Sequence, residues 1–490
     1  MKAILVLSDS LNRHFLPSYG NDWVQAPNIE RFARMSVTFD NHWIGSAPCM
    51  PARRDLITGR LNFLEREWGG LEPFDVPFPP LLQDHAAADG RGVFCHMETD
   101  HYHYFHVGGE NYHMPFNSWN FHRGQEWDTY VSRVDRPPEP EHLGKWKDQY
   151  ALNQTAFKSA ADFSTPRTFQ GAIDWLQANE GADNYFLWVE VFDPHEPFDC
   201  PPEYLDRYRD DWDGPLYNWS GYEKVDRESA ATKHLRKQYA ATLTMMDEWF
   251  GKLLDELKRQ NAFDDTLIIL TTDHGHLLGE RGLTGKNAWQ CWNELAHIPL
   301  IVHLPGDAHA GERRGQLTQN VDLMPTLLEY FGVPCTVPIH GEPWLPMLYE
   351  NAPAKRQSAL YGWFGQTVNV TDGVCTYFRA PVESNTPLYR YFLTPGSFSM
   401  RDVCHLSFYD GAELGHFLPW TPYPVIRADA YRRRSPDWAE SMLYNLETDY
   451  AQTTNLAGTP QEAQYIDLLR KTMENMDAPP SQYVRLGLDK

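Results

Sequence analysis

Cysteine is scarce in this chain of 490 residues, and the cysteines it has are scattered. Seven are present, at positions 49, 95, 200, 291, 335, 375 and 404, and no two form a Cys-x-x-Cys pair. An odd and dispersed set argues against a disulfide framework and against a zinc ribbon.

Long hydrophobic runs are also missing. The N-terminus, MKAILVLSDS, has an apolar run of five residues before Ser8. This run is too short for the core of a signal peptide or for a membrane span, and no other stretch could cross a bilayer. The sequence therefore predicts a cytoplasmic protein without a membrane partner, or a periplasmic one if a leader has been removed.

Positive charge is in deficit, with 43 Lys and Arg against 66 Asp and Glu and a net charge of −23. A chain this acidic is a poor partner for nucleic acid or for an anionic membrane. An anionic substrate would need positive charge concentrated at its own site. The hydrophobic content of 42% indicates a globular protein, and there is no repeat or low-complexity segment.

Short apolar runs that end in polar clusters recur along the chain. They cover residues 3–7, 92–97, 185–192, 266–270 and 298–304. Continuous runs of this kind predict strands buried on both faces. Amphipathic stretches lie between them, most clearly at about 228–260, so the pattern predicts a largely parallel α/β sheet. In such sheets, ligands bind beyond the carboxyl ends of the strands.

The pattern of predicted elements changes after about residue 355, where short, turn-bounded β segments precede a final helix at about 460–476. We therefore predict an α/β fold with a large mixed, mostly parallel sheet flanked by helices over residues 1–355. A smaller antiparallel α+β subdomain is expected over 356–490. A chain of this length is too long for one small core.

Two carboxylates close predicted strands. Asp9 follows the first run, Asp273 follows the fourth, and His274 comes next. Such groups suit a hard divalent cation, although each Asp alone could simply cap a helix. Cys49 does not match an oxygen-rich site of this kind, because a thiol is a soft ligand. Either Cys49 lies elsewhere or it does not act as a thiol.

The segment around Cys49 carries a resemblance. Cys-x-Pro-x-Arg followed by Leu-x-Thr-Gly-Arg, over residues 49–60, resembles the signature of the type I, formylglycine-dependent sulfatases of the alkaline phosphatase superfamily. Segments 9–21, 26–41, 193–198, 271–286, 321–333 and 443–457 resemble further blocks of that family, in its order. The resemblance implies that Cys49 is oxidised to formylglycine, whose hydrate is an oxygen nucleophile and a hard ligand.

The same resemblance implies one divalent metal, Ca²⁺ before Mg²⁺ or Mn²⁺. Its ligands would be Asp9, converted Cys49, Asp273 and His274, with His274 where many members have Asn. Ser10 departs from the family, which commonly has a second Asp there. A hydroxyl is a weaker ligand than a carboxylate, so the part of Ser10 in the metal site stays open.

The catalytic residues carried over are Arg53, which would hold the formylglycine and the anion, Lys286, which would contact the anion, and His195, which would contact the sulfate ester. Each has a plainer alternative. Arg53 could form a surface ion pair, Lys286 could lie in a solvated loop, and His195 could be structural.

The family often has Lys-x-His in one segment where this chain has Thr99 and His101, followed by His103. Thr99 and His103 are expected to bind substrate. The missing lysine leaves the acid that protonates the leaving group open between His101 and His195.

The resemblance implies a sulfuric ester hydrolase, and the alternative is a phosphonate monoester or phosphodiester hydrolase with the same apparatus. A third hypothesis is a protein that descends from this family, has lost catalysis and binds a sulfated ligand. Polar groups in DHYHYFH and DPHEPFD suit the hydroxyls of a sugar and favour a sulfated carbohydrate. The expected partners are a small-molecule or oligosaccharide sulfate ester and a formylglycine-generating enzyme. The question of a homo-oligomer stays open.

Overall fold

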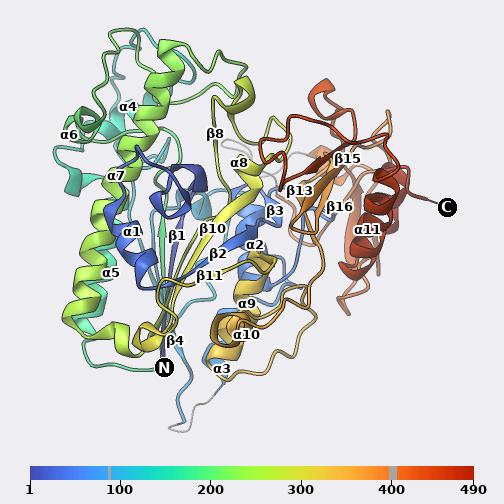
Figure 1. Cartoon of the computed structure of the whole chain (residues 1–490), viewed down its shortest axis with the longest axis horizontal. Helices are drawn as coiled ribbons and strands as arrows, with labels where there is room; N and C mark the ends of the chain where they lie inside the picture. Colours follow the sequence, from blue (N-terminus) through green and yellow to red (C-terminus); the bar gives the residue numbers. More distant parts are fainter. Residues whose placement is uncertain (86–89, 397–405, 490) are drawn as a thin grey trace.

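A large sheet organises the protein, as the computed structural model shows for residues 1–85, 90–396 and 406–489 (Figure 1). The sheet has nine strands in the order β11-β2-β10-β7-β1-β6-β4-β5, with β12 pairing with β2. The strands are β1 (Lys2–Ser8), β2 (Val37–Trp43), β4 (Phe94–Thr99), β5 (Ser118–Phe121), β6 (Tyr185–Val191), β7 (Thr266–Thr271), β10 (His297–His303), β11 (Arg313–Arg314) and β12 (Thr318–Gln319).

The five apolar runs of the sequence form β1, β4, β6, β7 and β10. Strand β1 lies at the centre and pairs in parallel with β6 and β7. Strand β10 is antiparallel to both of its main neighbours, so the sheet is mixed but mostly parallel, as predicted. Because β1 and β7 are adjacent and parallel, the residues that follow them emerge side by side at the same edge.

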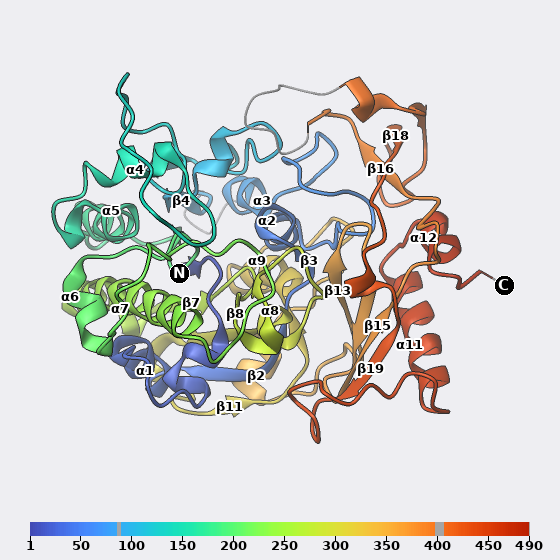
Figure 2. The ribbon, with the colours of Figure 1, turned by 90° about the horizontal axis from the view of Figure 1, so that it is seen from above.

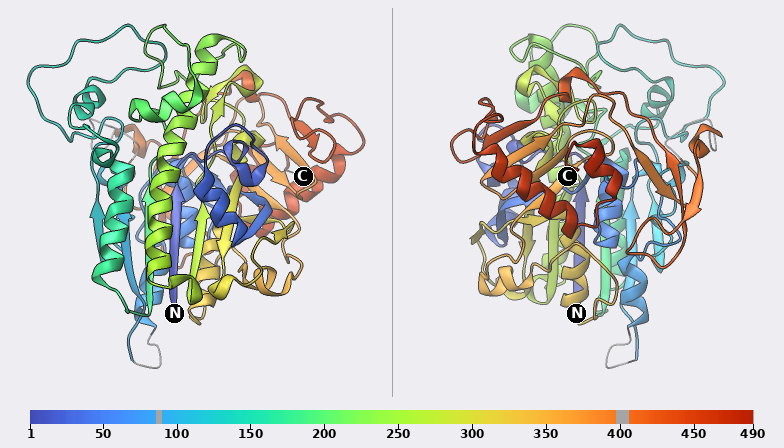
Figure 3. Two further views of the ribbon diagram at one scale, coloured as in Figure 1. Left: turned by 60° about the vertical axis from the view of Figure 1, so that its left-hand side comes forward. Right: turned by 90° about the vertical axis from the view of Figure 1, so that its right-hand side faces the viewer.

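Helices cover both faces of this sheet (Figure 3). One face packs against α1 (Pro27–Arg34), α5 (Ser164–Ala178) and α7 (Ala230–Arg259). The other face packs against α2 (Cys49–Thr58), α3 (Phe78–Asp84), α9 (Leu323–Tyr330) and α10 (Leu345–Glu350). Three further helices are α4 (Asp148–Gln154), α6 (Pro202–Leu205) and α8 (Asn293–Ala296). Alternate residues of β1 point to the two cores, Ile4 to the first and Leu5 to the second.

A smaller, mainly antiparallel sheet follows along the chain, as predicted (Figure 2). Its strands lie in the order β19-β15-β14-β13-β3, with bounds β3 (Ser46–Ala47), β13 (Ala359–Trp363), β14 (Val368–Thr371), β15 (Cys375–Arg379) and β19 (Met442–Asn445). Helices α11 (Glu462–Asn475) and α12 (Pro480–Arg485) pack against it. A three-stranded sheet is built from β16 (Tyr389–Phe392), β18 (Val425–Asp429) and β17 (Glu413–Gly415).

Strand β3 connects the two parts of the molecule. It lies just before α2 in the N-terminal part, yet it pairs in parallel with β13 of the smaller sheet. The boundary at residue 355 therefore stays a prediction, since the second sheet takes one strand from the first domain. In the described part of the chain, none of the helices has the length and apolar character that a membrane crossing requires.

Candidate active site

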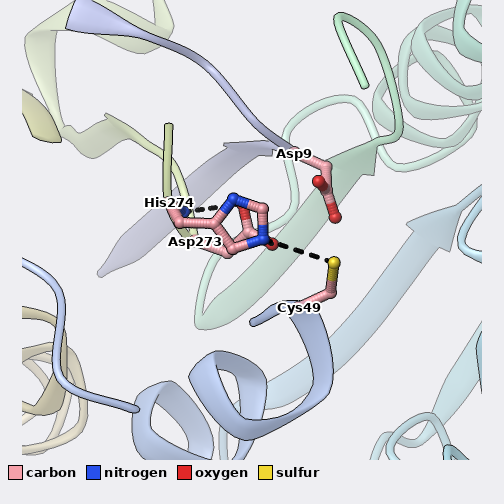
Figure 4. A group of neighbouring side chains, drawn as sticks. All are labelled: Asp9, Cys49, Asp273 and His274. Atoms are coloured by element: carbon pink, nitrogen blue, oxygen red, sulfur yellow. Dashed lines mark hydrogen bonds and ion pairs between the residues drawn. The ribbon is translucent and has the colours of Figure 1, made fainter. Parts of the chain in front are cut away.

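The first turn of α2 carries Cys49 to the edge of the large sheet, where β1 and β7 end. Asp9 follows β1, and Asp273 and His274 follow β7. Figure 4 shows the four side chains pointing toward one another. One ligand atom from each lies within 4.8 Å of the others, and all four residues are buried. The structure thus brings together four residues that the sequence assigned to one metal site.

His274 is held in one orientation by its own backbone. Its Nδ1 lies 2.9 Å from the carbonyl oxygen of Gly275, and its Nε2 lies 3.3 Å from Cys49 Sγ. A proton on Nδ1 donates to that carbonyl and leaves the Nε2 lone pair directed into the site. Burial lowers the pKa of His274, which favours the neutral imidazole that a metal ligand requires.

Arg53 lies one helical turn after Cys49, and three carboxylates surround its guanidinium group. Its Nε donates to Glu190 at 2.7 Å, its Nη1 to Asp273 at 2.5 Å and its Nη2 to Asp9 at 2.9 Å. Burial acts to lower the pKa of Arg53, but these carboxylates raise it well above its usual range. Arg53 is not among the residues that line the pocket, so its expected contact with the anion stays a prediction.

Asp9 is ionised at neutral pH. Burial acts to raise its pKa, but the positive charges of Arg53 and Lys286 lower it to about 2. Cys49 behaves in the opposite way, because burial and the charge of Asp9 raise the pKa of its thiol well above the usual value. The unmodified thiol is therefore protonated and is a poor ligand and nucleophile.

Lys286 is buried rather than solvated, with only 3% of its surface exposed. Its Nζ lies 3.2 Å from Ser10 Oγ and 3.7 Å from Cys49 Sγ. Ser10 in turn donates its hydroxyl to Asp9 at 2.8 Å, and its backbone N–H donates to Asp273 at 3.0 Å. Ser10 thus orients both carboxylates, and its part as a metal ligand stays a prediction.

The donor set fits a divalent cation. Two carboxylates and a neutral imidazole suit hard or borderline metals, whereas a protonated thiol does not. Replacement of the thiol of Cys49 by an aldehyde hydrate would give a set made of oxygen and nitrogen. The sequence analysis noted that a soft thiol does not suit an oxygen-rich site for a hard cation. The folded site has the same mismatch, and it concerns the Cys49 sulfur.

The candidate histidines lie at different depths. His195 and His103 line the pocket, whereas His101 and Thr99 are not among its lining residues. His195 Nδ1 lies 2.5 Å from the Glu196 carbonyl oxygen, and its Nε2 lies 4.0 Å from Asp9. Burial lowers the pKa of His195 to about 3.

His101 and Thr99 lie beneath the site. His101 Nε2 is 3.3 Å from the Met50 sulfur, and its Nδ1 is 4.0 Å from Asp9. Thr99 donates its hydroxyl to Glu190 at 3.3 Å. The catalytic role of His101 and the substrate contact of Thr99 stay predictions, because neither side chain borders the pocket.

The pocket above this floor encloses about 340 Å³, within the range of small-molecule sites. Cys49, His195 and Lys286 form its base. Aromatic side chains contribute to its walls, namely Trp68, Trp127, Tyr222, Trp363 and Phe364. The walls come from both parts of the molecule, since Trp363 ends β13 of the smaller sheet.

Three buried acids complete the site and were not predicted. Glu196 lies 3.8 Å from Lys286 Nζ and 3.0 Å from His276 Nε2. Glu190 holds Arg53, and Glu126 lies 3.3 Å from His103. Glu190 had a signal in the sequence, because a charge within the apolar run 185–192 requires a buried partner. Glu126 lies in a long loop and had none.

Comparison with known proteins gives consistent matches. The family model described as Sulfatase matches residues 2–333. A choline-sulfatase from Rhizobium meliloti is 24% identical over 360 residues, which cover 67% of each chain. An N-acetylglucosamine-6-O-sulfatase from Bacteroides thetaiotaomicron is 23% identical over 414 residues, which cover 73% of each chain.

Solved structures share the fold over nearly the whole chain. A protein in complex with its substrate D-glucosamine-2-N,6-O-disulfate superposes with a TM-score of 0.68 and 18% identity, over 97% of this chain and 98% of the other. A phosphonate monoester hydrolase of Agrobacterium radiobacter also gives a TM-score of 0.68, with 17% identity over 97% of this chain and 95% of the other.

Proposed function

This chain belongs to the sulfatase family, and from that premise we propose that it cleaves the sulfate ester of a carbohydrate with a formylglycine made from Cys49. The family makes the protein a sulfuric ester hydrolase. The finer proposal rests chiefly on one observation, the placement of Cys49 at the base of a pocket between Asp9, Asp273, His274 and Lys286.

The residues divide into those that hold the catalytic groups and those that face the substrate. Asp9, Asp273 and His274 would hold a divalent metal, for which we favour Ca²⁺ because two ligands are carboxylates. The metal would supply Lewis-acid charge to the oxygens of the ester. Formylglycine would supply two hydroxyl groups, one for attack on sulfur and one whose deprotonation expels sulfate.

Lys286 and His195 act on the ester itself. Lys286 points its ammonium group at the Cys49 sulfur from 3.7 Å, where it can neutralise charge that develops in the transition state. His195 directs Nε2 toward the site. Burial holds the pKa of its ring low, so it can act as the acid only once the negative charge of a bound ester raises that pKa and places a proton on Nε2. Arg53 keeps Asp9 and Asp273 in place through direct hydrogen bonds.

The test is to produce the protein with and without a formylglycine-generating system. In the first case we expect the tryptic peptide of residues 35–53 to lose the mass of a thiol-to-aldehyde exchange, and activity on sulfate esters to appear with it.

Cys49→Ala should abolish turnover and leave the melting temperature near that of the wild type. Cys95→Ala, at another buried cysteine, is the matched control and should keep its turnover. Full turnover in Cys49→Ala would refute the assignment of the nucleophile.

Phosphonate monoesters provide the discriminating substrate. Sulfate monoesters and phosphonate monoesters each carry one negative charge, so charge alone does not separate the two activities. We expect kcat/KM for sulfated sugars to exceed that for phenyl phosphonate monoesters. A ratio well below one would assign the protein to phosphonate hydrolysis and would leave the metal and formylglycine proposals standing.

A further inference from the structure

We propose that the preferred substrate carries a second anionic group, a carboxylate or another sulfate, and that Lys145 and Arg432 bind it on the pocket walls. This inference rests on the proposed function, because it takes the cleaved sulfate to lie over Cys49. The observation behind it is that two cations line the pocket and, among the residues that the structure describes, neither has a carboxylate within ion-pair distance, in a chain whose net charge is −23.

Lys145 belongs to the loop that forms one wall. Its backbone N–H donates to the carbonyl oxygen of Trp219 at 2.8 Å, which fixes the chain at this point. Its Nζ lies 3.5 Å from the centre of the Tyr222 ring, in a cation–π contact. Among the described residues, no carboxylate lies within ion-pair distance of Lys145. Burial lowers the pKa of this half-buried ammonium, so its charge would gain from an anion.

Arg432 belongs to another wall and is held by backbone groups. Its Nη1 donates to the carbonyl oxygen of Phe364 at 3.0 Å, and its Nη2 to that of Asn287 at 3.4 Å. The buried Asn385 donates to the backbone carbonyl of Arg432 at 2.8 Å and so fixes the position of this residue. In the described ranges, Arg432 also has no carboxylate at ion-pair distance. A guanidinium group donates up to five hydrogen bonds, so donors remain for a ligand.

The carboxylates of the pocket are already engaged elsewhere. Glu196 faces Lys286 and His276, and Glu67 lies 3.3 Å from Arg390. Glu126 accepts a hydrogen bond from the Tyr102 hydroxyl at 2.5 Å. Glu196 and Glu126 act on Lys145, and Glu67 acts on Arg432, only through the pocket and not by direct contact. Each of the two cations can therefore take a direct contact from an anionic group of the substrate.

The aromatic walls indicate what separates the two anions. Trp127 stacks on Trp219 with ring centres 5.5 Å apart, and Trp363 and Phe364 lie beside Arg432 and Asn287 on the lining. Flat apolar faces of this kind suit the faces of a sugar ring. The chemical class that fits is a sugar with one sulfate at the base of the pocket and a second anionic substituent on the same ring or on the next.

The experiment uses matched pairs of sulfate monoesters that differ by one anionic group. N-acetylglucosamine 6-O-sulfate, whose nitrogen is uncharged, is compared with glucosamine 2-N,6-O-disulfate, and 4-nitrophenyl sulfate with an analogue that has a ring carboxylate. We expect the converted wild type to show a higher kcat/KM for the dianionic member of at least one pair. Lys145→Met and Arg432→Met should each reduce that preference about tenfold, as the loss of one charge-assisted hydrogen bond predicts.

The matched control is Lys224→Met, because Lys224 is 69% exposed, is paired with Asp437 and does not line the pocket. It should keep both the activity and the preference. The proposal is overturned if every pair is hydrolysed without preference for the dianion. It is also overturned if both pocket variants lower kcat/KM equally for the two members of a pair.

A binding measurement separates this inference from the proposed function. In full-length Cys49→Ala protein, calorimetry gives the Kd of each glucosamine ester at low and at moderate salt. Tighter binding of the disulfate, weakened about tenfold by Lys145→Met, supports the second-anion site even if the converted enzyme hydrolyses no sulfate ester. Equal Kd values for the two esters overturn it, whatever the turnover shows.

Discussion

Arg53 is the single side chain whose loss should disturb the site most. Its guanidinium group lies between Asp9, Asp273 and Glu190 and is 1% exposed. Removal of one partner of a buried ion pair commonly costs about 3–5 kcal/mol, because the remaining charge is left uncompensated. We expect Arg53→Met to lower the free energy of unfolding by about this amount in protein freed of metal by a chelator. Denaturant unfolding measures it.

The neighbouring Arg54 provides the control. It is also buried, but it pairs with one carboxylate, Asp75, through two bonds of 2.8 Å. Arg54→Met should lose less stability than Arg53→Met and should retain its turnover. Equal losses in the two variants would show that the three carboxylates around Arg53 do not repel one another as the geometry requires.

Lys286 should affect the reaction more than the fold. Lys286→Ala removes the ammonium group nearest to Cys49, and loss of one such group typically costs about 10²–10³ in rate. We expect kcat on a sulfate ester to fall by at least about tenfold, with the secondary structure retained in circular dichroism. Lys224→Ala, at an exposed lysine, is the comparison. Unchanged kcat in Lys286→Ala would remove this lysine from the mechanism.

At the scale of single elements, the stability of α2 depends on the residue that follows its C-terminal end. Gly59 follows its last residue with a φ of +66°, a conformation that costs other residues about 1–2 kcal/mol. A Cβ at this position would lie 3.2 Å from the Met324 sulfur and from Ile339 Cγ2. We therefore expect Gly59→Ala to lower the melting temperature more than Gly20→Ala. Gly20 also has a positive φ, but it faces open space. The reverse order would mean that the contacts around Gly59 adjust freely.

The elements of the sheet differ in how far the sequence predicts them. Strands β1 and β7 are continuous apolar runs, so their existence follows from pattern alone, whereas the meeting of Asp9 with Asp273 was predicted from the strand ends together with the family resemblance. Strand β2, VTFDNHW, includes polar residues and gives no such run. The direction of β10 depends on its connections, and its side-chain pattern does not reveal it. These strands are therefore fixed by tertiary packing rather than by local pattern.

The residues of the site likewise differ in how far the sequence predicts their positions. Residues that come directly after strands, such as Asp9 and His274, could be placed together from the sequence. Lys286 lies in a loop after β9 (Thr284–Gly285), as expected, but it is buried and not solvated, because it contacts Glu196 and Ser10 from distant segments. Glu126 and Lys145 lie on a long loop whose path no local pattern predicts. Charge pairing across the fold, rather than spacing along the chain, decides where these groups lie.

At the scale of the whole molecule, a polar contact joins the end of α2 to the C-terminal helices. Arg60 Nη2 lies 2.8 Å from Asp477, and His340 Nε2 lies 3.4 Å from the same carboxylate. The hydrogen bond from His340 lowers the pKa of Asp477 to about 2, against opposing burial and with further help from Arg60. A carboxyl group whose pKa is lowered by folding stabilises the protein above its unfolded pKa and loses this effect as the pH falls.

Asp477→Asn should therefore be less stable than the wild type at pH 7, and the difference should shrink between about pH 4 and pH 2. The side chain is 37% exposed, so screening by water limits the effect to about 1 kcal/mol or less. Thermal melts of both proteins across this pH range measure it. A difference in stability that persists at the lowest pH at which both proteins fold would mean that Asp477→Asn destabilises the protein for reasons other than the lost charge.

The pairing of β3 with β13 has a consequence for the order of events on the ribosome. Ser46 and Ala47 close the smaller sheet immediately before Cys49, whose surface is 1% exposed once the fold is complete. Roughly 300 residues separate Cys49 from β13, and at about 5–20 residues per second their translation takes between about 15 and 60 seconds. During this interval β13 does not yet exist to pair with β3, so the contacts that bury Cys49 in the folded protein are incomplete. Under the conversion that we propose for Cys49, the pairing of β3 with a late strand would limit the time in which a modifying enzyme can reach this residue. We then expect a purified, folded chain that was not converted during synthesis to keep its thiol.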